Sequence, residues 1–408
     1  MELFVRNQEL CQQCGFCTNH ISCPAEPPKF DPSTCLGCRA CFLGCPHKAI
    51  QKQTIEEDHE IIRIFVDGLA YEIPRRITVK TALENLGFCF DKLPASDCFF
   101  SPCETGGCYA CEMLIDGQIT PACHTPVKRD MRIQTKVPLD SHPLRIVSGY
   151  MAHSVGGVGT PCDLKIDSYR PIEVAVFSHG CQLRCPTCQN FGVTYGSKNN
   201  PSTPAEVASI LTKYRKKYHV DRMAISGGEP TLNRRWLIQF FRHLKKLNPD
   251  KKARLHLDTN ATVLTPRYID ELVKAGITDI GPDLKGIRIE TFMEITGIQD
   301  KNLAKNYSKT AWGVVEYIAD NYYPEQLFMG VGIPYNAAWM STEEIREMGE
   351  RIVQINPEIQ VTVLDYRPTF RRRDILKPGV EEMFSIKQQL NDVGLKTVLV
   401  QTSIGHFK

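Results

Sequence analysis

The second part of the chain alternates short apolar runs with longer amphipathic stretches. The apolar runs predict strands at residues 172–178, 222–228, 254–261, 279–284, 327–333, 360–366 and 397–402. Helical periodicity predicts helices at residues 204–218, 232–247, 266–276, 309–322, 341–355 and 381–394. Repeated strand–helix units indicate an α/β domain with a parallel sheet, either open or barrel-like. Such a sheet places its chemistry at the carboxyl ends of its strands.

The front part of the chain has a different pattern. Residues 61–73 alternate apolar and polar positions around Asp67-Gly68, which is a strong β-hairpin signal. Residues 78–88 then have the periodicity of a short amphipathic helix that ends at Gly87. A hairpin followed by a helix is the opening of a β-grasp domain.

These patterns divide the chain into four segments. We expect a cysteine-dense first domain with little periodicity at residues 1–53 and a β-grasp domain at residues 54–140. A glycine-containing linker is expected at residues 141–170, and the α/β domain at residues 171–408. The first segment is poor in core-forming residues, so it is expected to fold around an inorganic centre.

Composition and charge are those of an ordinary globular protein. The 408 residues are 42% hydrophobic, and 49 basic residues nearly balance 46 acidic ones. A net charge of +3 gives no sign of a nucleic-acid-binding surface. No apolar run approaches the roughly 20 residues that span a bilayer, and the first residues are too polar for a signal peptide. We therefore expect a cytoplasmic protein that binds neither nucleic acid nor membrane.

The cysteines depart from this ordinary composition. All 18 lie between Cys11 and Cys188, in tight clusters. A secreted disulfide scaffold would be short and cross-linked throughout. In a long chain, clusters of this kind indicate metal ligation instead.

The first cluster is a doubled run in which each half ends in Cys-Pro. The halves are Cys11-x2-Cys14-x2-Cys17-x5-Cys23 and Cys35-x2-Cys38-x2-Cys41-x3-Cys45. This run resembles bacterial dicluster ferredoxins, in which the fourth cysteine of each half binds the other cluster. The resemblance implies one [4Fe–4S] cluster on Cys11, Cys14, Cys17 and Cys45, and another on Cys35, Cys38, Cys41 and Cys23. Two four-cysteine zinc sites are the alternative.

The second cluster is Cys103-x4-Cys108-x2-Cys111-x11-Cys123. Its x4 and x2 spacings match the plant-type [2Fe–2S] pattern, and Gly106-Gly107 would let the loop pass close to the cluster. The segment resembles the [2Fe–2S] domains of the succinate dehydrogenase and xanthine dehydrogenase families. A zinc ribbon is the alternative.

The third cluster is Cys181-x3-Cys185-x2-Cys188, directly after the first strand of the α/β domain. Three cysteines on a [4Fe–4S] cluster leave one iron without a protein ligand. Like the open coordination site of a catalytic metal, this iron is available for chemistry. The motif resembles radical S-adenosylmethionine (SAM) enzymes, especially the activating enzymes of glycyl-radical proteins. The resemblance implies a partial (β/α)6 barrel and assigns the catalytic role to these three cysteines. A three-ligand zinc or structural site is the alternative.

Further motifs follow at the predicted strand ends, in the order of that family. The resemblance implies that Gly227, Gly228 and Glu229 hold the methionine amino group of SAM, that Asn260 contacts the ribose or carboxylate, that Lys285 pairs with the carboxylate, and that Ile333 lies along the adenine. It also implies a monovalent-cation site on Asp258, Thr259 and Asp283. Thr187 departs from the pattern, because these enzymes usually carry an adenine-contacting aromatic there. The adenine contact is therefore expected from another residue.

Three cysteines and one loop remain. Cys89 is interpreted as apolar core filler, and Cys98 as a residue close to the second cluster in sequence but not a ligand. Cys162 is interpreted as an inert loop residue, with a reactive thiol that feeds the active site as the alternative. The arginine-rich loop at residues 366–373 follows the sixth strand on the active-site side and is interpreted as a solvated loop, with a docking surface for an acidic substrate or partner as the alternative.

Together the motifs predict an enzyme with three [4Fe–4S] clusters, one [2Fe–2S] cluster and SAM. The resemblance implies reductive cleavage of SAM to a 5′-deoxyadenosyl radical. We hypothesise that a ferredoxin, a flavodoxin or a reductase loads the first clusters and that the electron passes through the chain's own clusters to the third motif, with outward electron flow as the alternative. The expected substrate is a protein, with a glycyl-radical enzyme as the suggested partner. Oxidation or modification of a small molecule or peptide, and an electron-transfer subunit without its own chemistry, are the alternatives.

Overall fold

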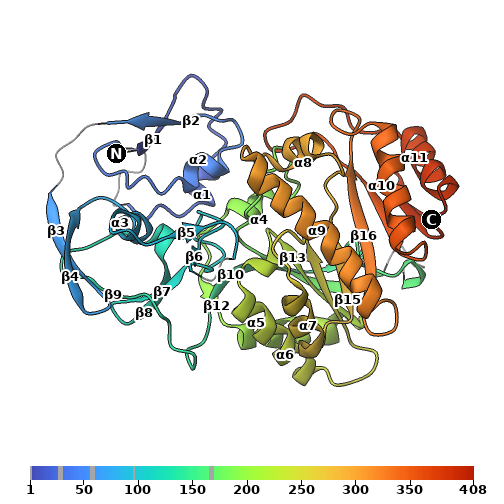
Figure 1. Cartoon of the computed structure of the whole chain (residues 1–408), viewed down its shortest axis with the longest axis horizontal. Coiled ribbons are helices and arrows are strands. Elements are labelled where there is room, and N and C mark those ends of the chain that lie inside the picture. Colours follow the sequence, from blue (N-terminus) through green and yellow to red (C-terminus); the bar gives the residue numbers. More distant parts are fainter. Residues whose placement is uncertain (1, 26–30, 56–59, 95–96, 165–169) are drawn as a thin grey trace. The chain divides into compact units, whose positions relative to one another are not determined.

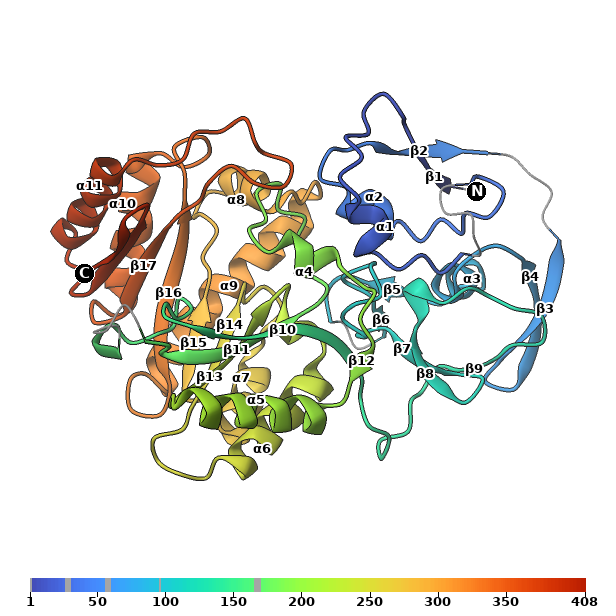
Figure 2. The ribbon, with the colours of Figure 1, turned by 180° about the vertical axis from the view of Figure 1, so that it is seen from behind.

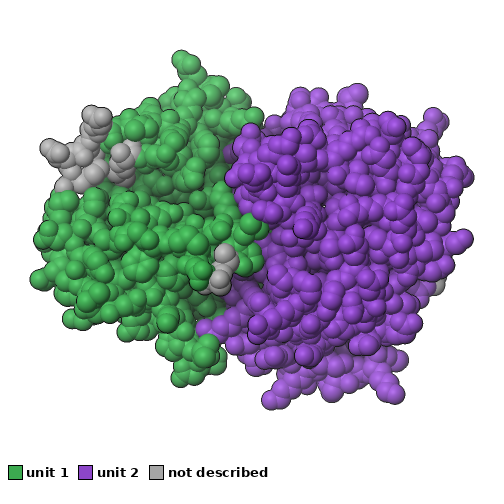
Figure 3. Space-filling model, viewed as in Figure 1, with its two compact units in different colours: residues 1–148, 178–182, 190–203 green, residues 149–177, 183–189, 204–408 purple. Residues whose placement is uncertain are grey.

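The computed structural model describes residues 2–25, 31–55, 60–94, 97–164 and 170–408. The chain divides into two compact units, which are coloured separately in Figure 3. Unit 1 comprises Met1–Ser148, Ser178–Gln182 and Asn190–Thr203, and unit 2 comprises Gly149–Phe177, Leu183–Gln189 and Pro204–Lys408. No helix in the described part of the chain is long and apolar enough to cross a membrane.

Unit 1 begins with a small cysteine-rich layer. Strand β1 (Glu2–Arg6) pairs antiparallel with β2 (Ile50–Thr54), and two short helices, α1 (Phe16–Asn19) and α2 (Ala40–Gly44), lie between them in the chain. One apolar cluster here includes Phe4 and Ile50, and several cysteines pack against it. That this segment folds around an inorganic centre stays a prediction.

A five-stranded sheet follows, in the order β4-β3-β9-β7-β8. Its strands are β3 (Ile61–Val66), β4 (Leu69–Pro74), β7 (Glu112–Ile115), β8 (Gln118–Pro121) and β9 (Arg132–Gln134). Asp67 and Gly68, with φ of 48° and 88°, form the tight turn between β3 and β4, so the predicted hairpin is confirmed. The predicted helix is also present, as α3 (Val79–Asn85), and Thr78 caps its first turn.

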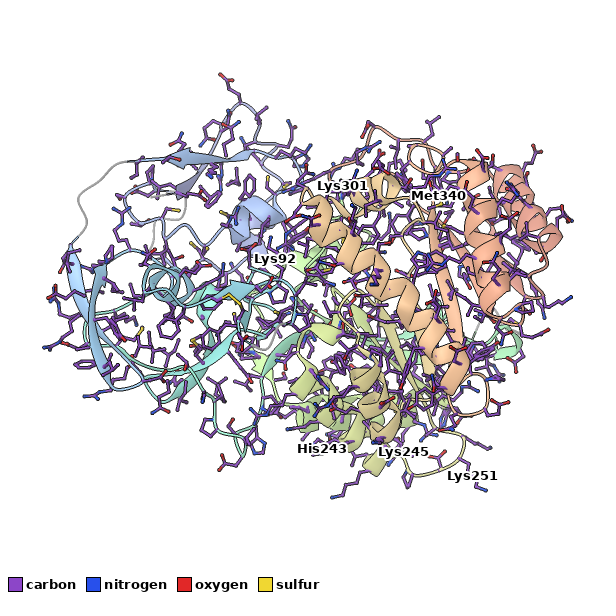
Figure 4. The ribbon with its side chains drawn as sticks, viewed as in Figure 1. Lys92, His243, Lys245, Lys251, Lys301 and Met340 are labelled. Carbon is purple, nitrogen blue, oxygen red and sulfur yellow. A yellow bond between two sulfur atoms is a disulfide. The ribbon has the colours of Figure 1, made fainter. Side chains whose placement is uncertain are left out.

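A disulfide joins Cys89 and Cys98 beside this sheet, and it is drawn as a yellow bond in Figure 4. The two residues flank a short parallel pair, β5 (Phe90–Asp91) and β6 (Phe99–Phe100). The interpretation of Cys89 as apolar core filler is therefore wrong, because its sulfur is bonded to Cys98.

The parallel strands and helices predicted for the second part of the chain are present (Figure 1). The strand order is β10-β11-β13-β14-β15-β16-β17-β18-β19, and β13 to β18 pair in parallel. The strands are β10 (Arg145–His153), β11 (Glu173–Ser178), β13 (Arg222–Gly227), β14 (Arg254–Thr259), β15 (Asp279–Pro282), β16 (Phe328–Tyr335), β17 (Gln360–Asp365), β18 (Val398–Thr402) and β19 (Gly405–Phe407). The helices are α5 (Pro204–Tyr218), α6 (Arg234–Leu247), α7 (Pro266–Ala275), α8 (Ile289–Thr296), α9 (Lys301–Asn321), α10 (Thr342–Ile355) and α11 (Val380–Asp392).

Shorter elements complete the chain. Helix α4 (Phe191–Tyr195) and strand β12 (Pro201–Ser202) belong to unit 1, and 3-10 turns occur at Ala122–His124, Cys162–Leu164 and Pro230–Leu232. The six-stranded partial barrel stays a prediction.

The segment that we interpreted as a linker contributes to the α/β domain. Strand β10 lies beside β11 in the sheet, as Figure 2 shows, and residues 156–159 pack closely against β14 to β16. A Cβ atom on Gly157 would overlap the Asp258 carboxylate, and one on Gly159 would overlap the Ile280 carbonyl oxygen. Residues 165–169 of the expected linker lie outside the described residues.

Candidate functional site

The cysteines of the first segment form two groups in unit 1. A cavity of about 270 Å³ is lined by Cys11, Cys14, Cys17 and Cys45, and a second, smaller cavity by Cys23, Cys35, Cys38 and Cys41. The structure therefore brings together the two sets that the dicluster resemblance implies, including the exchange of the fourth cysteine. Backbone amides also approach the sulfurs: Ala49 N lies 3.3 Å from Cys45 Sγ and Phe4 N lies 3.5 Å from Cys35 Sγ. Hydrogen bonds of this kind are typical around iron–sulfur clusters.

The four cysteines of the second motif are also brought together in unit 1. Cys103, Cys108, Cys111 and Cys123 are all buried. The Cys103 thiol interacts with Cys108 and Cys123, and these hydrogen bonds hold its pKa well below the ordinary value. The amides of Thr105 and Ala110 point at Cys103 and Cys108 at 3.5 and 3.4 Å. This donor set fits an iron–sulfur cluster.

The arrangement of possible metal ligands can also be compared with what a single metal ion requires. Within the described ranges, no three His, Cys, Asp or Glu side chains converge as ligands of one ion. An iron–sulfur cluster distributes its cysteines over several iron atoms, so it needs wider spacing than a single ion does.

The third motif crosses from one unit to the other. Cys181 belongs to unit 1, whereas Cys185 and Cys188 belong to unit 2. Burial raises the pKa of the Cys185 thiol to about 12, although Lys285 opposes this effect. A thiol of this kind is deprotonated when it coordinates a metal, so the environment of Cys185 suits a cluster ligand better than a free thiolate.

Within unit 2, the loop after β17 is hydrogen-bonded to the cysteine loop, residues 183–189, which carries Cys185 and Cys188. The amides of Arg371 and Arg372 donate to Pro186 O at 2.9 and 3.1 Å, and the Gln189 side chain donates to Arg367 O at 3.1 Å. Sequence reasoning treated residues 366–373 as a solvated loop. It missed this contact because the hydrogen bonds are made largely by the backbone, which leaves no side-chain signal.

Glu229 connects the ends of β13 and β14. Its carboxylate is 1% exposed and accepts hydrogen bonds from Thr231 N at 3.0 Å, Thr231 Oγ1 at 2.6 Å, Thr259 Oγ1 at 2.7 Å and Asn260 N at 2.7 Å. Burial raises the pKa of Glu229, while the hydrogen bonds oppose that shift. Gly227, with φ of 112°, precedes this turn as the last residue of β13. The side chain therefore fixes the strand ends, besides any contact with a ligand.

Asp283 and Lys285 form a buried ion pair just beyond β15, with Nζ 3.3 Å from Oδ2. Burial acts to lower the pKa of Lys285, but Asp283 raises it above the ordinary value, so the side chain is a fixed cation. The Tyr366 ring is close enough to Lys285 and Cys185 for the charges to interact. The sequence placed Tyr366 on the active-site side but did not reveal its proximity to Lys285 and Cys185.

The predicted cation-site residues have protein partners. Asp258 Oδ1 lies 2.7 Å from His256 Nε2, Thr259 donates to Glu229, and Asp283 pairs with Lys285. Asp258 and Asp283 are near enough to interact electrostatically. A monovalent cation on Asp258, Thr259 and Asp283 stays a prediction.

The adenine contacts also stay predictions. Ile333 is fully buried in β16, and its side chain alternates in direction with Gly332, which faces Asp283. Thr187 is 1% exposed, and within the part of the chain described here its hydroxyl has no hydrogen-bond partner.

Comparison with known families gives two matches. Residues 175–340 match the radical SAM superfamily, and residues 27–50 match a 4Fe–4S binding domain. Both matches agree with the motifs read from the sequence.

Three curated proteins are similar to parts of the chain. A probable GTP 3′,8-cyclase of Methanococcus aeolicus is 32% identical over 117 residues, which are 29% of this chain and 38% of that protein. A putative glycyl-radical enzyme activating enzyme of Methanocaldococcus jannaschii is 30% identical over 28% of this chain and 43% of its own length. The pyruvate formate-lyase-activating enzyme of Streptococcus mutans is 31% identical over 32% of this chain and 51% of its own length.

Among solved structures, SuiB of Streptococcus suis bound to the precursor peptide SuiA aligns with a TM-score of 0.44 and 17% identity. The alignment covers 57% of this chain and 49% of SuiB. The matched part of the chain covers 38% to 51% of the length of the three curated relatives.

Proposed function

We propose that this chain, which contains a radical SAM domain and a 4Fe–4S binding motif, reductively cleaves SAM and uses the product radical to abstract hydrogen. A [4Fe–4S] cluster on Cys181, Cys185 and Cys188 would bind SAM through its free iron and supply the electron that breaks the S–C5′ bond, giving methionine and a 5′-deoxyadenosyl radical. The remaining roles belong to the chain's own residues.

The observation that carries this proposal is the set of polar groups at the strand ends of unit 2. Lys285 provides a buried, permanently charged partner for the SAM carboxylate, close to Cys185. Glu229 fixes Asn260 and the glycine turn that would receive the methionine amino group. These groups follow consecutive parallel strands, which is where α/β folds bind ligands.

We also propose that the twelve cysteines of unit 1 hold two [4Fe–4S] clusters and one [2Fe–2S] cluster. Their grouping supports this: two cavities contain the two exchanged sets, and the third set is buried together. Plant-type [2Fe–2S] centres lie near about −400 mV, which suits electron supply to a low-potential reaction. A ferredoxin, a flavodoxin or a reductase would load them.

The proposed substrate is a protein, with a glycyl-radical enzyme as the first candidate. A putative glycyl-radical enzyme activating enzyme and a pyruvate formate-lyase-activating enzyme are similar to parts of this chain, which supports this class. Several probable GTP 3′,8-cyclases are similar to it as well, so small-molecule or peptide modification is the second candidate.

One experiment tests the proposed chemistry. Anaerobically reconstituted protein is incubated with SAM and dithionite, and 5′-deoxyadenosine is quantified by chromatography. The wild type is expected to form it, whereas Cys185→Ala is expected to form none and to keep the [2Fe–2S] spectrum. Absence of 5′-deoxyadenosine from the fully loaded wild type would favour an electron-transfer subunit without its own chemistry.

A further inference from the structure

The loop of the second cysteine motif touches the chain directly before Cys181, entirely within unit 1. A Cβ atom on Gly180 would lie 2.9 Å from both the Cβ and the amide nitrogen of Cys108, and 3.1 Å from Cys103 Cβ. A Cβ atom on Gly107 would lie 2.8 Å from His179 Cβ. Glycine at both positions thus permits a closer approach than any side chain would allow.

Hydrogen bonds connect the same two segments. Ile146 N donates to Gly107 O at 3.2 Å, and His179 N donates to Ile146 O at 3.0 Å. A path of covalent and hydrogen bonds therefore leads from Cys108 through Gly107, Ile146 and His179 to Gly180, the residue before Cys181.

His179 is held rigidly in this path. Its side chain is buried, with Nδ1 2.7 Å from Gly196 O and Nε2 2.7 Å from Ser148 Oγ. A carbonyl can only accept, so Nδ1 carries a proton and donates to Gly196 O. Hydrogen bonds at both ring nitrogens therefore fix the orientation of the imidazole.

We propose that the contact of Gly107 and Cys108 with His179 and Gly180 is the path by which the electron for SAM cleavage reaches Cys181, so that the Cys103–Cys108–Cys111–Cys123 set is the immediate donor. This inference rests on the proposed function. One electron leaves the reduced [2Fe–2S] centre, which is oxidised, and one electron enters the centre on Cys181, Cys185 and Cys188. The oxidised donor is then reduced again by the external low-potential protein.

The first cysteine motif borders the second motif within unit 1. A cavity of about 430 Å³ in unit 1 is lined by both Cys38, from the first motif, and Cys123, from the second. Arg39 and Lys80 pair with Glu104 at its wall, at 3.5 and 3.6 Å. The set that contains Cys38 therefore borders the same cavity as the [2Fe–2S] set, which is compatible with electron entry through the first motif.

Electron paramagnetic resonance tests the path independently of turnover. The full-length protein, reconstituted and reduced with dithionite, is compared with Cys185→Ala, and the spin relaxation of the [2Fe–2S] signal is measured. A neighbouring paramagnetic cluster accelerates relaxation, so the signal of the variant is expected to relax several-fold more slowly. Equal relaxation in both proteins would overturn the proposed contact, whatever the activity.

Two alanine variants, one at Gly107 and one at Gly192, test the same path kinetically. Pre-reduced protein is mixed with SAM in the absence of further reductant, and reoxidation of the [2Fe–2S] absorbance is followed. Gly107→Ala, whose new Cβ must displace His179, is expected to slow reoxidation several-fold. Gly192→Ala is the matched control, because a Cβ there meets no atom within 4 Å. Equal rates for the wild type and Gly107→Ala, or equal slowing in the two variants, would contradict the path.

The outcomes separate the two levels of the proposal. If dithionite-driven 5′-deoxyadenosine forms but the [2Fe–2S] centre is not reoxidised by SAM, the path is wrong and the proposed function stands. If no 5′-deoxyadenosine forms while the relaxation effect is present, the proposed chemistry is wrong and the contact stands.

Discussion

Glu229 shows how one side chain organises the candidate site. A buried carboxylate without partners would be strongly destabilising, but here four donors surround it. Two of the donors belong to β14 or the residue after it, so the side chain joins neighbouring strand ends.

We predict that Glu229→Gln lowers both stability and SAM affinity. One carboxylate oxygen becomes an NH2 group that faces donors, and the unsatisfied groups should lower the free energy of unfolding by about 1–3 kcal/mol. Denaturant unfolding and calorimetric SAM titration measure the two effects. Glu290→Gln is the control: its exposed carboxylate pairs with Lys301, labelled in Figure 4 at the start of α9. Similar losses in the two variants would contradict a special role for Glu229.

Cys98 and Cys103 make a second prediction at the scale of single residues. Cys98 is bonded to Cys89, whereas Cys103 interacts with the other cysteines of the second motif. Cys98→Ser should therefore keep the visible absorbance of the [2Fe–2S] centre, and Cys103→Ser should lose it. Loss of that absorbance in Cys98→Ser would show that the cluster uses a different ligand set.

The sequence predicted cysteine groups better than cysteine pairs. Spacings of two and four residues limit which thiolates can reach one cluster, so the local sequence is enough to assign Cys11 or Cys108 to a group. The Cys89–Cys98 bond depends on the pairing of β5 with β6, which the sequence pattern did not reveal. The role of Tyr366 beside Lys285 depends in the same way on the packing of distant strand ends.

At the scale of elements, helix α10 has only one half of the capping box that its first residues suggest. Ser341, Thr342 and Glu344 suggest a capping box. Ser341 does cap the helix, accepting from Glu344 N at 3.2 Å. The Glu344 carboxylate, however, accepts from the amides of Ile287 and Arg288 and from Thr291 Oγ1, at 3.0, 3.1 and 2.6 Å. It thus holds the segment that follows Lys285.

We predict different effects for the two ends of this motif. Ser341→Ala should lower the free energy of unfolding by about 1 kcal/mol, the usual contribution of an N-cap. Glu344→Ala should cost about 1–3 kcal/mol because it leaves buried donors unsatisfied, and it should also weaken SAM binding. Chemical denaturation and SAM titration distinguish them. Unchanged SAM affinity in Glu344→Ala would contradict a positioning role.

Residues 156–159 support a further prediction for an element. Gly157→Ala places a Cβ atom against the Asp258 carboxylate, and such overpacking typically costs about 1–3 kcal/mol. Gly313→Ala, in the middle of α9 with no atom within 4 Å of the new Cβ, should instead stabilise by about 0.5–1 kcal/mol. Thermal unfolding of both variants checks the opposite signs. A lower unfolding temperature for Gly313→Ala would contradict the expected opposite effects of the two variants.

The sequence could not reveal this packing. Helices and strands leave periodic patterns, and those patterns predicted the parallel strands of unit 2. Residues 156–159 have no period, and glycines in a close approach are indistinguishable from glycines in a linker until the fold is known.

For the whole molecule, the prediction concerns the number of iron atoms. Three [4Fe–4S] clusters and one [2Fe–2S] cluster require about 14 iron atoms per chain. Iron and acid-labile sulfide assays on anaerobically reconstituted protein measure this number. Cys185→Ala should contain about 10 iron atoms, because only the cluster of the third motif is lost. A wild-type value near the content of the first two motifs alone would contradict the proposed SAM site.

The division of the chain into units has a consequence for how such a protein could arise. Segments on both sides of Leu183–Gln189 belong to unit 1, where Phe191 packs against Phe16. A recombination event that exchanged only the first 140 residues would leave these segments facing a surface they do not fit. A transplant of the front of the chain would therefore need to include the matching residues 178–182 and 190–203.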